Sequence, residues 1–165
     1  MLNVDVFTLV NYSEEKIVYK NILIATDGSE LATQGLSHGL NLAKALNQSA
    51  TIVTTTHIWP PTAVTDDTGL FMSDSIENFD KLASKEAQII LKSAQEIADK
   101  LGVSCEYIHV GNRYPAEGIL ETVNSKGCDL IVMASHGRRG LKKVLLGSVA
   151  NEVLVNSNVP VLIVR

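Results

Sequence analysis

Five short apolar runs alternate with helical patterns along this chain, and this alternation constrains the fold more than any other feature. The runs cover residues 21–26, 50–57, 104–110, 129–134 and 159–165. Continuously apolar runs of this length are typical of strands that are buried on both faces of a parallel sheet. Between them, apolar residues recur at helical spacing. The alternation predicts an α/β fold: a single doubly wound domain whose five-stranded parallel sheet carries helices on both faces.

The ends of the predicted helices carry capping signals. Ser29 is expected to cap the first helix. Asp74 with Glu77 resembles a capping box at the start of the second helix. Gly102 and Gly127 are expected to end the second and third helices. The four predicted helices cover about residues 29–47, 74–102, 115–127 and 148–156.

Length and charge limit the class of protein. At 165 residues the chain is about one domain long, and a domain of this size buries roughly 70% of its unfolded surface. The net charge of −4 argues against nucleic acid or an anionic membrane as a general partner. No apolar run is long enough to span a membrane. Cys105 and Cys128 are predicted to be reduced core residues of a cytoplasmic protein.

The first residues are the least informative part of the chain. Residues 1–18 alternate only imperfectly between apolar and polar side chains, so they predict neither a clear strand nor a signal peptide. We therefore divide the chain into an N-terminal extension of unknown role, residues 1–18, and an α/β domain, residues 19–165.

A glycine-rich segment follows the fourth predicted strand and leads into the last helix. Gly137 and Gly140 lie in the loop, and Gly147-Ser148 begins the helix. Glycines allow a ligand to approach the backbone, and the first turn of a helix offers unpaired N–H groups and a partial positive charge. Four basic residues accompany them: Arg138, Arg139, Lys142 and Lys143. The segment therefore predicts a site for a phosphorylated ligand.

Other glycine motifs fit this segment less well. No Gly-Lys-Ser/Thr follows, and the G-x-G-x-x-G of a dinucleotide fold is missing. Gly137 and Gly140 also form the GxxG of an RNA-binding KH loop, but such a loop joins two helices in a basic domain. A surface loop with incidental glycines stays open as the simplest alternative.

The spacing from Gly137 through nine residues to Gly147-Ser148, with SHGRRG before it and LLGS at its end, resembles the universal stress protein family. In nucleotide-binding members the motif is G-x2-G-x9-G-[S/T], and Ala134 occupies the first glycine position here. The resemblance covers about residues 19–165. It implies the strand order 3-2-1-4-5, which the alternation alone does not establish.

This resemblance also implies a nucleotide site at the carboxyl ends of the strands. Thr55 and Met133 are expected near the adenine, and Asp27, from the end of the first strand, at the ribose or Mg²⁺. Gly137 and Gly147 are expected where phosphate oxygens reach backbone N–H groups. The predicted nucleotide-binding residues are Ala25, Thr26, Asp27, Thr55, Met133, Ala134, His136, Gly137, Arg138, Gly147, Ser148 and Val149. Position 134 ends a strand, so we expect a negative φ that tolerates its methyl group.

A dedicated catalytic site is not indicated. His136 has no acidic residue beside it in the sequence, and the other histidines (His38, His57 and His109) have no metal-ligand spacing. No metal site formed by protein side chains alone is predicted, and any hydrolysis of ATP is expected to be slow.

The function predicted from these observations is a cytoplasmic universal stress protein that binds ATP with Mg²⁺ and acts in the stress response as a signalling or protective module. The alternative is a nucleotide-free, dimeric interaction module of the same family. The last apolar run would form an edge strand, which pairing with a second copy would protect. We therefore predict a homodimer through Val161, Leu162, Ile163 and Val164.

Overall fold

The fold is a five-stranded parallel sheet with the strand order β3-β2-β1-β4-β5. A computed structural model describes residues 19–56, 72–138 and 146–165. The strands are β1 (Asn21–Ala25), β2 (Ser49–Thr55), β3 (Cys105–Val110), β4 (Leu130–Ala134) and β5 (Val161–Val164). The predicted fold class and the strand order implied by the family resemblance are both confirmed.

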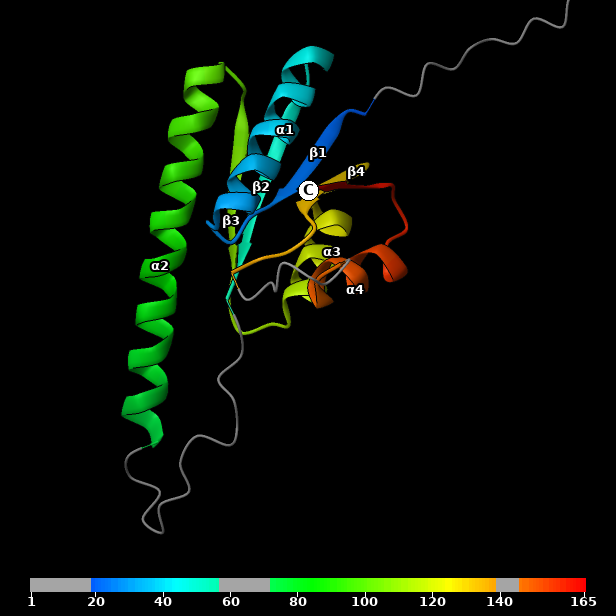
Figure 1. Cartoon of the computed structure of the whole chain (residues 1–165). Coiled ribbons are helices and arrows are strands. Elements are labelled where there is room, and N and C mark those ends of the chain that lie inside the picture. Colours follow the sequence, from blue (N-terminus) through cyan, green and yellow to red (C-terminus); the bar gives the residue numbers. More distant parts are fainter. Residues whose placement is uncertain (1–18, 57–71, 139–145) are drawn as a thin grey trace, which may run out of the picture.

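Four helices cover the two faces of the sheet (Figure 1). They are α1 (Glu30–Leu46), α2 (Met72–Leu101), α3 (Pro115–Lys126) and α4 (Ser148–Asn156). α1 and α2 pack on one face, whereas α3 and α4 pack on the other. None of the helices in the described ranges is both long and apolar enough to cross a membrane.

The two faces of the sheet enclose separate hydrophobic cores, because successive side chains of a strand point to opposite sides. In β1, Ile22 and Ile24 contact α1 and α2, whereas Leu23 and Ala25 contact α3 and α4. The three largest of these side chains (Ile22, Leu23 and Ile24) are completely buried. Burial of one such side chain stabilises the fold by about 1.5–3 kcal/mol. β1 therefore connects both cores.

Local chemistry explains most of the helix ends. The hydroxyl of Ser29 accepts a hydrogen bond from the Ala32 amide at 3.2 Å, as an N-cap does. Asn47 and Gly127 end α1 and α3 in the left-handed conformation. The capping box expected at Asp74 is wrong, because α2 begins at Met72 and Asp74 lies within its first turn.

The strand ends differ from the prediction by a few residues. β2 ends at Thr55, and His57, which we expected at its end, lies outside the described residues. β5 is shorter than the run from 159 to 165 because Pro160 lies before its first residue and its ladder with β4 covers only four residue pairs. An apolar run shows where a strand lies, whereas the ladder of hydrogen bonds decides where it ends. Residues 1–18 also lie outside the described part of the chain.

α1 passes so close to the sheet that glycine is required on its inner face. A methyl group at Gly39 would lie 2.7 Å from Cδ1 and 2.8 Å from Cγ1 of Ile24. The side chain of Ile24 is completely buried, so it cannot move aside into solvent. Close packing of α1 on β1 therefore depends on Gly39.

We predict that Gly39→Ala destabilises the protein by about 1–3 kcal/mol through overpacking, although alanine is a better helix former than glycine. For a chain of this length the melting temperature should fall by roughly 2–12 °C. Thermal unfolding followed by circular dichroism measures the change. The control is Gln34→Ala on the exposed side of α1, which should change the free energy of unfolding by less than about 0.5 kcal/mol. Equal melting temperatures for Gly39→Ala and wild type would contradict the prediction.

Candidate functional site

The candidate site lies at the carboxyl ends of β1 and β4, where the order of the strands reverses. β1 pairs with both β2 and β4. From β2 the chain continues to β3 on one side of the sheet, and from β4 it continues to β5 on the other side, so these two connections run in opposite directions. Ligands of doubly wound sheets bind at such a position. The structure brings eleven of the twelve predicted residues to the ends of β1 and β4 and the start of α4: Ala25, Thr26, Asp27, Met133, Ala134, His136, Gly137, Arg138, Gly147, Ser148 and Val149. Thr55, the twelfth, ends the neighbouring strand β2.

The loop after β1 is a tight turn that places Asp27 at the end of the strand. The buried hydroxyl of Thr26 accepts a hydrogen bond from the Gly28 amide at 3.2 Å. Oδ1 of Asp27 accepts one from the Ser29 amide at 3.0 Å. Gly28 has a φ of +77°, which a residue with a side chain rarely adopts. The turn therefore holds the Asp27 carboxylate in a defined orientation before α1 begins.

Asp27 also binds the loop after β4. Its Oδ2 accepts a hydrogen bond from the Arg138 amide at 2.8 Å, and its main-chain carbonyl accepts one from Nε of Arg138 at 2.7 Å. A methyl group at Gly137 would lie 2.4 Å from Oδ2 of Asp27. Gly137 is therefore needed for the close approach of the two loops.

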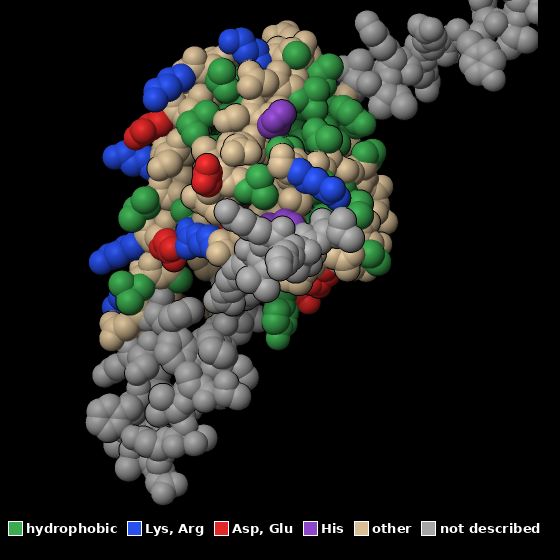
Figure 2. Space-filling model, viewed as in Figure 1, with side chains coloured by type: hydrophobic (Ala, Val, Ile, Leu, Met, Phe, Trp, Pro, Cys, Tyr) green, Lys and Arg blue, Asp and Glu red, His purple; other side chains and the backbone are tan. Residues whose placement is uncertain are grey.

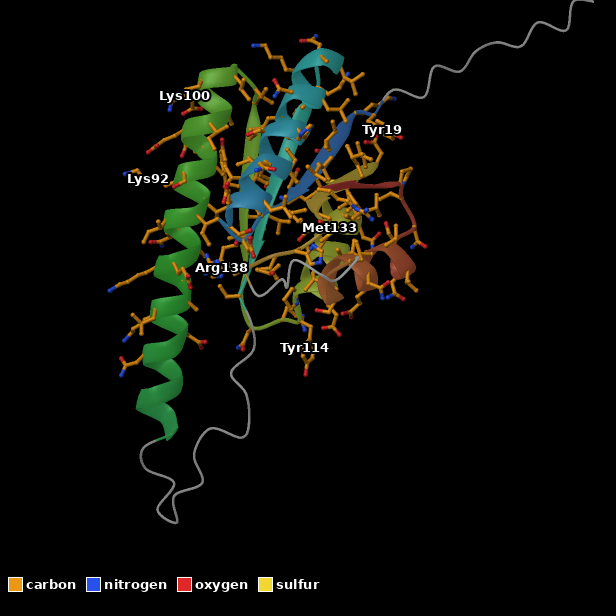
Figure 3. All side chains as sticks on the ribbon, viewed as in Figure 1. Tyr19, Lys92, Lys100, Tyr114, Met133 and Arg138 are labelled. Carbon is orange, nitrogen blue, oxygen red and sulfur yellow. The ribbon has the colours of Figure 1, made fainter. Side chains whose placement is uncertain are left out.

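Arg138 continues this contact to α2. Its Nη1 forms a hydrogen-bonded ion pair with Oε1 of Glu86. Figure 3 shows Arg138 beside α2, near the carboxyl ends of the strands. The guanidinium group thus joins residues from three segments that are distant in the sequence. The other basic residues expected here (Arg139, Lys142 and Lys143) lie outside the described part of the chain.

The start of α4 lies against the end of β4. The Gly147 amide donates a hydrogen bond to the carbonyl of Ser135 at 2.8 Å, and a methyl group at Gly147 would lie 3.1 Å from the same oxygen. This corrects one expectation: the N–H group of Gly147 already has a partner and is not free for a phosphate. The free donors are the first amides inside α4, beginning with Ser148 and Val149, because the first amides of a helix have no partner within it.

His136 lies between β4 and α4. Its Nδ1 is 3.1 Å from the hydroxyl of Ser135, and its Cδ2 would be 3.8 Å from a methyl group at Gly147. Its Nε2 is buried and has no hydrogen-bond partner within the described ranges. An unpaired buried nitrogen costs free energy, so this ring presents an unused polar atom beside the first turn of α4.

The methyl group of Ala134 is compatible with the backbone. Among the described residues, only Asn47 and Asn112 carry a side chain and have a positive φ. Ala134 therefore has the negative φ expected of the last residue of a strand, which confirms that prediction. Gly35 of α1 packs behind this position, since a methyl group there would lie 3.3 Å from the Ala134 amide.

Residues expected near an adenine share the face that is covered by α3 and α4. Ala25 and Met133 are paired in register and belong to the core on this face. Thr55 alternates with Val53, which belongs to the same core. The methyl carbon of Thr55 would lie 3.2 Å from a methyl group at Gly118 of α3. The three residues therefore lie on one side of the sheet, near the carboxyl ends of β2, β1 and β4.

The described residues provide no other reactive centre. No group of three or more histidine, cysteine, aspartate or glutamate side chains in these ranges could hold a metal ion. Cys105 and Cys128 are free thiols. Burial raises the pKa of both thiols, which disfavours the nucleophilic thiolate.

Two contributors to the site were not predicted from the sequence. Glu86 and Ile90 lie one helical turn apart on α2; Glu86 binds Arg138, and Cγ1 of Ile90 would lie 3.0 Å from a methyl group at Gly28. No local pattern marks either residue, because both belong to the ordinary charge and apolar pattern of an amphipathic helix. Only the docking of α2 on the sheet reveals them.

The residues that carry the site also match a family model. The model of the universal stress protein family matches residues 18–165. The chain belongs to the universal stress protein family. Two similar curated relatives are universal stress protein YxiE of Bacillus subtilis, 36% identical over 90% of this chain and all of that protein, and universal stress protein MJ0531 of Methanocaldococcus jannaschii, 34% identical over 90% of this chain and 83% of that protein.

Solved structures of universal stress proteins share this fold. The structure of MJ0577 of Methanocaldococcus jannaschii superposes with a TM-score of 0.73 at 28% identity and covers 90% of this chain and 96% of that chain. A universal stress protein in complex with cAMP has a TM-score of 0.64 at 24% identity over 90% and 98% of the two chains. The Archaeoglobus fulgidus protein in complex with dAMP has a TM-score of 0.63 at 20% identity over 90% and 100%.

A histidine next to the site couples stability to pH. His109 lies near the carboxyl end of β3, with its Nε2 2.9 Å from the hydroxyl of Thr56. Burial lowers the pKa of His109 below its ordinary value. The unfolded chain therefore binds this proton more readily than the folded protein does.

We predict that His109 reduces stability as the pH falls. The stability that the buried His109 ring contributes is fully present above the pKa of about 6.5 that a histidine has in the unfolded chain. This stability is lost as the pH falls from there toward the lower pKa of His109 in the folded protein. His109→Gln should therefore flatten the dependence of the free energy of unfolding on pH between about 7.5 and 5, measured by urea denaturation. Gln34→Ala should keep the wild-type slope. An unchanged slope in His109→Gln would show that other groups cause the dependence.

Proposed function

We propose that this universal stress protein binds an adenine nucleotide with Mg²⁺, ATP in particular, at the carboxyl ends of β1 and β4. The observation that carries the proposal is the position of the first turn of α4, which lies beside the glycine loop and Asp27 at the point where the strand order reverses. The complexes of related proteins with cAMP and dAMP support it.

The phosphates are assigned to the start of α4. The available donors are the amide and the hydroxyl of Ser148 and the amide of Val149. The helix dipole favours an anion there. Gly147 keeps this turn uncovered, because it has no side chain at the N-cap. The unpaired Nε2 of His136 is buried beside this turn and would become a further polar contact only if a bound phosphate reached it.

The adenine and ribose are assigned to the sheet side of the site. Ala25, Thr55 and Met133 lie near the carboxyl ends of three neighbouring strands, where apolar side chains would suit a planar base. Asp27 fits a ribose hydroxyl or a magnesium ion, because a carboxylate accepts about four hydrogen bonds and two amides use only part of this capacity. The described residues form no metal site by themselves, so Mg²⁺ would bind together with the phosphates.

The expected output is a signalling or protective role in the stress response, determined by whether nucleotide is bound. Any hydrolysis is expected to be slow, because the site within the described ranges offers no obvious base for a water molecule. We place the protein in the cytoplasm, which its two free thiols support. The alternative is a nucleotide-free interaction module, which the direct contact between Asp27 and Arg138 favours, since it occupies both residues without a ligand.

We predict that ATP with Mg²⁺ stabilises the protein. At a ligand concentration one hundred times the dissociation constant the gain is about 2.7 kcal/mol, a rise in melting temperature of roughly 5–10 °C. Gly147→Val should abolish this shift, because its side chain would meet the carbonyl of Ser135 and cover the start of α4. Ala134→Gly should change the nucleotide-dependent rise in melting temperature little.

Thermal unfolding with and without millimolar ATP-Mg²⁺ tests this prediction. The nucleotide content of the purified protein after denaturation gives an independent measurement. A shift in Ala134→Gly but not in wild type would show that Ala134 marks a lost site. No shift in either protein would favour the nucleotide-free alternative.

We also propose that the protein is a homodimer through β5. Among the described residues β5 pairs with β4 alone and therefore forms an edge of the sheet. Leu162 exposes 42% of its surface on this strand. An exposed apolar edge strand invites pairing with another chain, and a two-fold axis would place the segment formed by Val161, Leu162, Ile163 and Val164 antiparallel to the same segment of a second copy.

We predict that Leu162→Glu shifts the protein toward the monomer, because it places a charged side chain on the edge that a second copy would cover. Sedimentation at micromolar concentration should give about twice the chain mass of 17.8 kDa for wild type and a smaller mass for the variant. The control is Leu82→Glu on the exposed side of α2, which should stay dimeric. A monomeric wild-type protein would refute the proposal.

A further inference from the structure

Three residues form a bridge over the loop that follows β1, and the proposed phosphate contacts do not account for it. The Arg138 bridge consists of Asp27, Glu86 and Arg138. Three nitrogen atoms of Arg138 each have an acidic or carbonyl partner: the amide binds Oδ2 of Asp27, Nε binds the carbonyl of Asp27, and Nη1 binds Oε1 of Glu86. A cation next to a proposed phosphate site is therefore already neutralised by the protein.

The surroundings of the bridge fit this arrangement. Glu86 and Ile90 lie on the same side of α2, one turn apart. Ile90 packs on Gly28, and a methyl group at Gly28 would lie 3.6 Å from Nη2 of Arg138. Gly28 thus leaves the space in which the guanidinium group passes from the sheet to α2. Figure 2 shows basic and acidic side chains interspersed along the α2 side of this view.

An arginine binds a phosphate best when its planar group of donors is free to meet two oxygen atoms. In the Arg138 bridge, Nε and Nη1 from this group are held by Asp27 and Glu86. A ligand phosphate that is to meet Nη1 of Arg138 must replace the carboxylate of Glu86 there, whereas no hydrogen bond holds Nη2 within the described residues. Each Asp27 contact joins a main-chain group to a side-chain group within the two adjoining loops, and together they orient the arginine, whereas the contact with the exposed Glu86 side chain is the exchangeable one.

We propose that Glu86 regulates nucleotide binding by competing with ligand phosphate groups for Arg138. This inference rests on the proposed nucleotide function and names a regulator of the same site. Glu86 is a positioning residue, because it acts through Arg138. The competition lowers the affinity for phosphorylated ligands and leaves the affinity for the unphosphorylated nucleoside unchanged.

The expected size of the effect follows from exposure. The side chains of Arg138 and Glu86 are 44% and 54% exposed, so solvent screens their attraction. Exposed ion pairs of this kind contribute about 0.2–1 kcal/mol, which corresponds to a change in the dissociation constant of roughly 1.4- to 5-fold. The effect should decrease as the salt concentration rises.

The test is isothermal titration calorimetry at low ionic strength with ATP-Mg²⁺, AMP and adenosine. Glu86→Gln keeps the shape of the side chain and removes its charge, so it should bind ATP roughly 1.4- to 5-fold more tightly and adenosine as wild type does. The matched control is Glu106→Gln, which removes the same charge from the Glu106–Lys126 pair near the amino end of β3. The control should leave all three affinities unchanged.

A double-mutant cycle with Arg138→Gln separates competition from general repulsion between Glu86 and the ligand. If Glu86 acts through Arg138, Glu86→Gln should have no effect in the Arg138→Gln background. An equal gain in both backgrounds would overturn the proposal. Arg138→Lys, which lacks the fork of donors, replaces Arg138→Gln if thermal unfolding shows that this variant does not fold.

The outcomes also separate this inference from the proposed function. Equal affinity of wild type and Glu86→Gln for ATP overturns the inference and leaves the proposed function intact. Binding of ATP by Glu86→Gln but not by wild type supports the competition and removes ATP binding from the wild-type protein. Binding by neither protein overturns both proposals.

Discussion

The structure depends on the hydrogen-bonded ladder that joins β1 to both β2 and β4. Because β1 is the central strand, its side chains fill the two cores on opposite faces, and Ile22, Leu23 and Ile24 are completely shielded from water. The same pairing places the carboxyl ends of β1 and β4 side by side. The central strand is therefore both the main source of hydrophobic stabilisation and the element that assembles the candidate site.

The two loops at these strand ends hold each other in place. Asp27 satisfies the amides of Ser29 and Arg138, and Ser135 satisfies the amide of Gly147. These contacts require glycine at the points of closest approach, Gly137 and Gly147, for reasons of space. Glycine in this motif thus serves the contact between protein segments as well as access to a ligand.

Most polar groups described at the site already have hydrogen-bond partners within the protein. Arg138, the basic residue that the structure describes here, is bound by acceptors of the protein, whereas the first amides of α4 have no partner within their helix. A nucleotide would therefore gain its first contacts from the backbone dipoles at the start of α4. Additional attraction from arginine would depend on an exchange of partners, which gives a surface ion pair of modest strength a regulatory role.

The sequence by itself determined the parallel α/β fold, the capping of α1 by Ser29 and the negative φ of Ala134, because these follow from local periodicity, local hydrogen bonds and strand geometry. Apolar runs could not show where the strands end, since each end depends on a neighbouring strand, and the capping box at Asp74 was wrong for a similar reason. Only the tertiary structure decided that the Gly147 amide is already paired and that Glu86 reaches Arg138. Both contacts join residues that are distant in the chain, and their partners are chosen by how helices dock on the sheet.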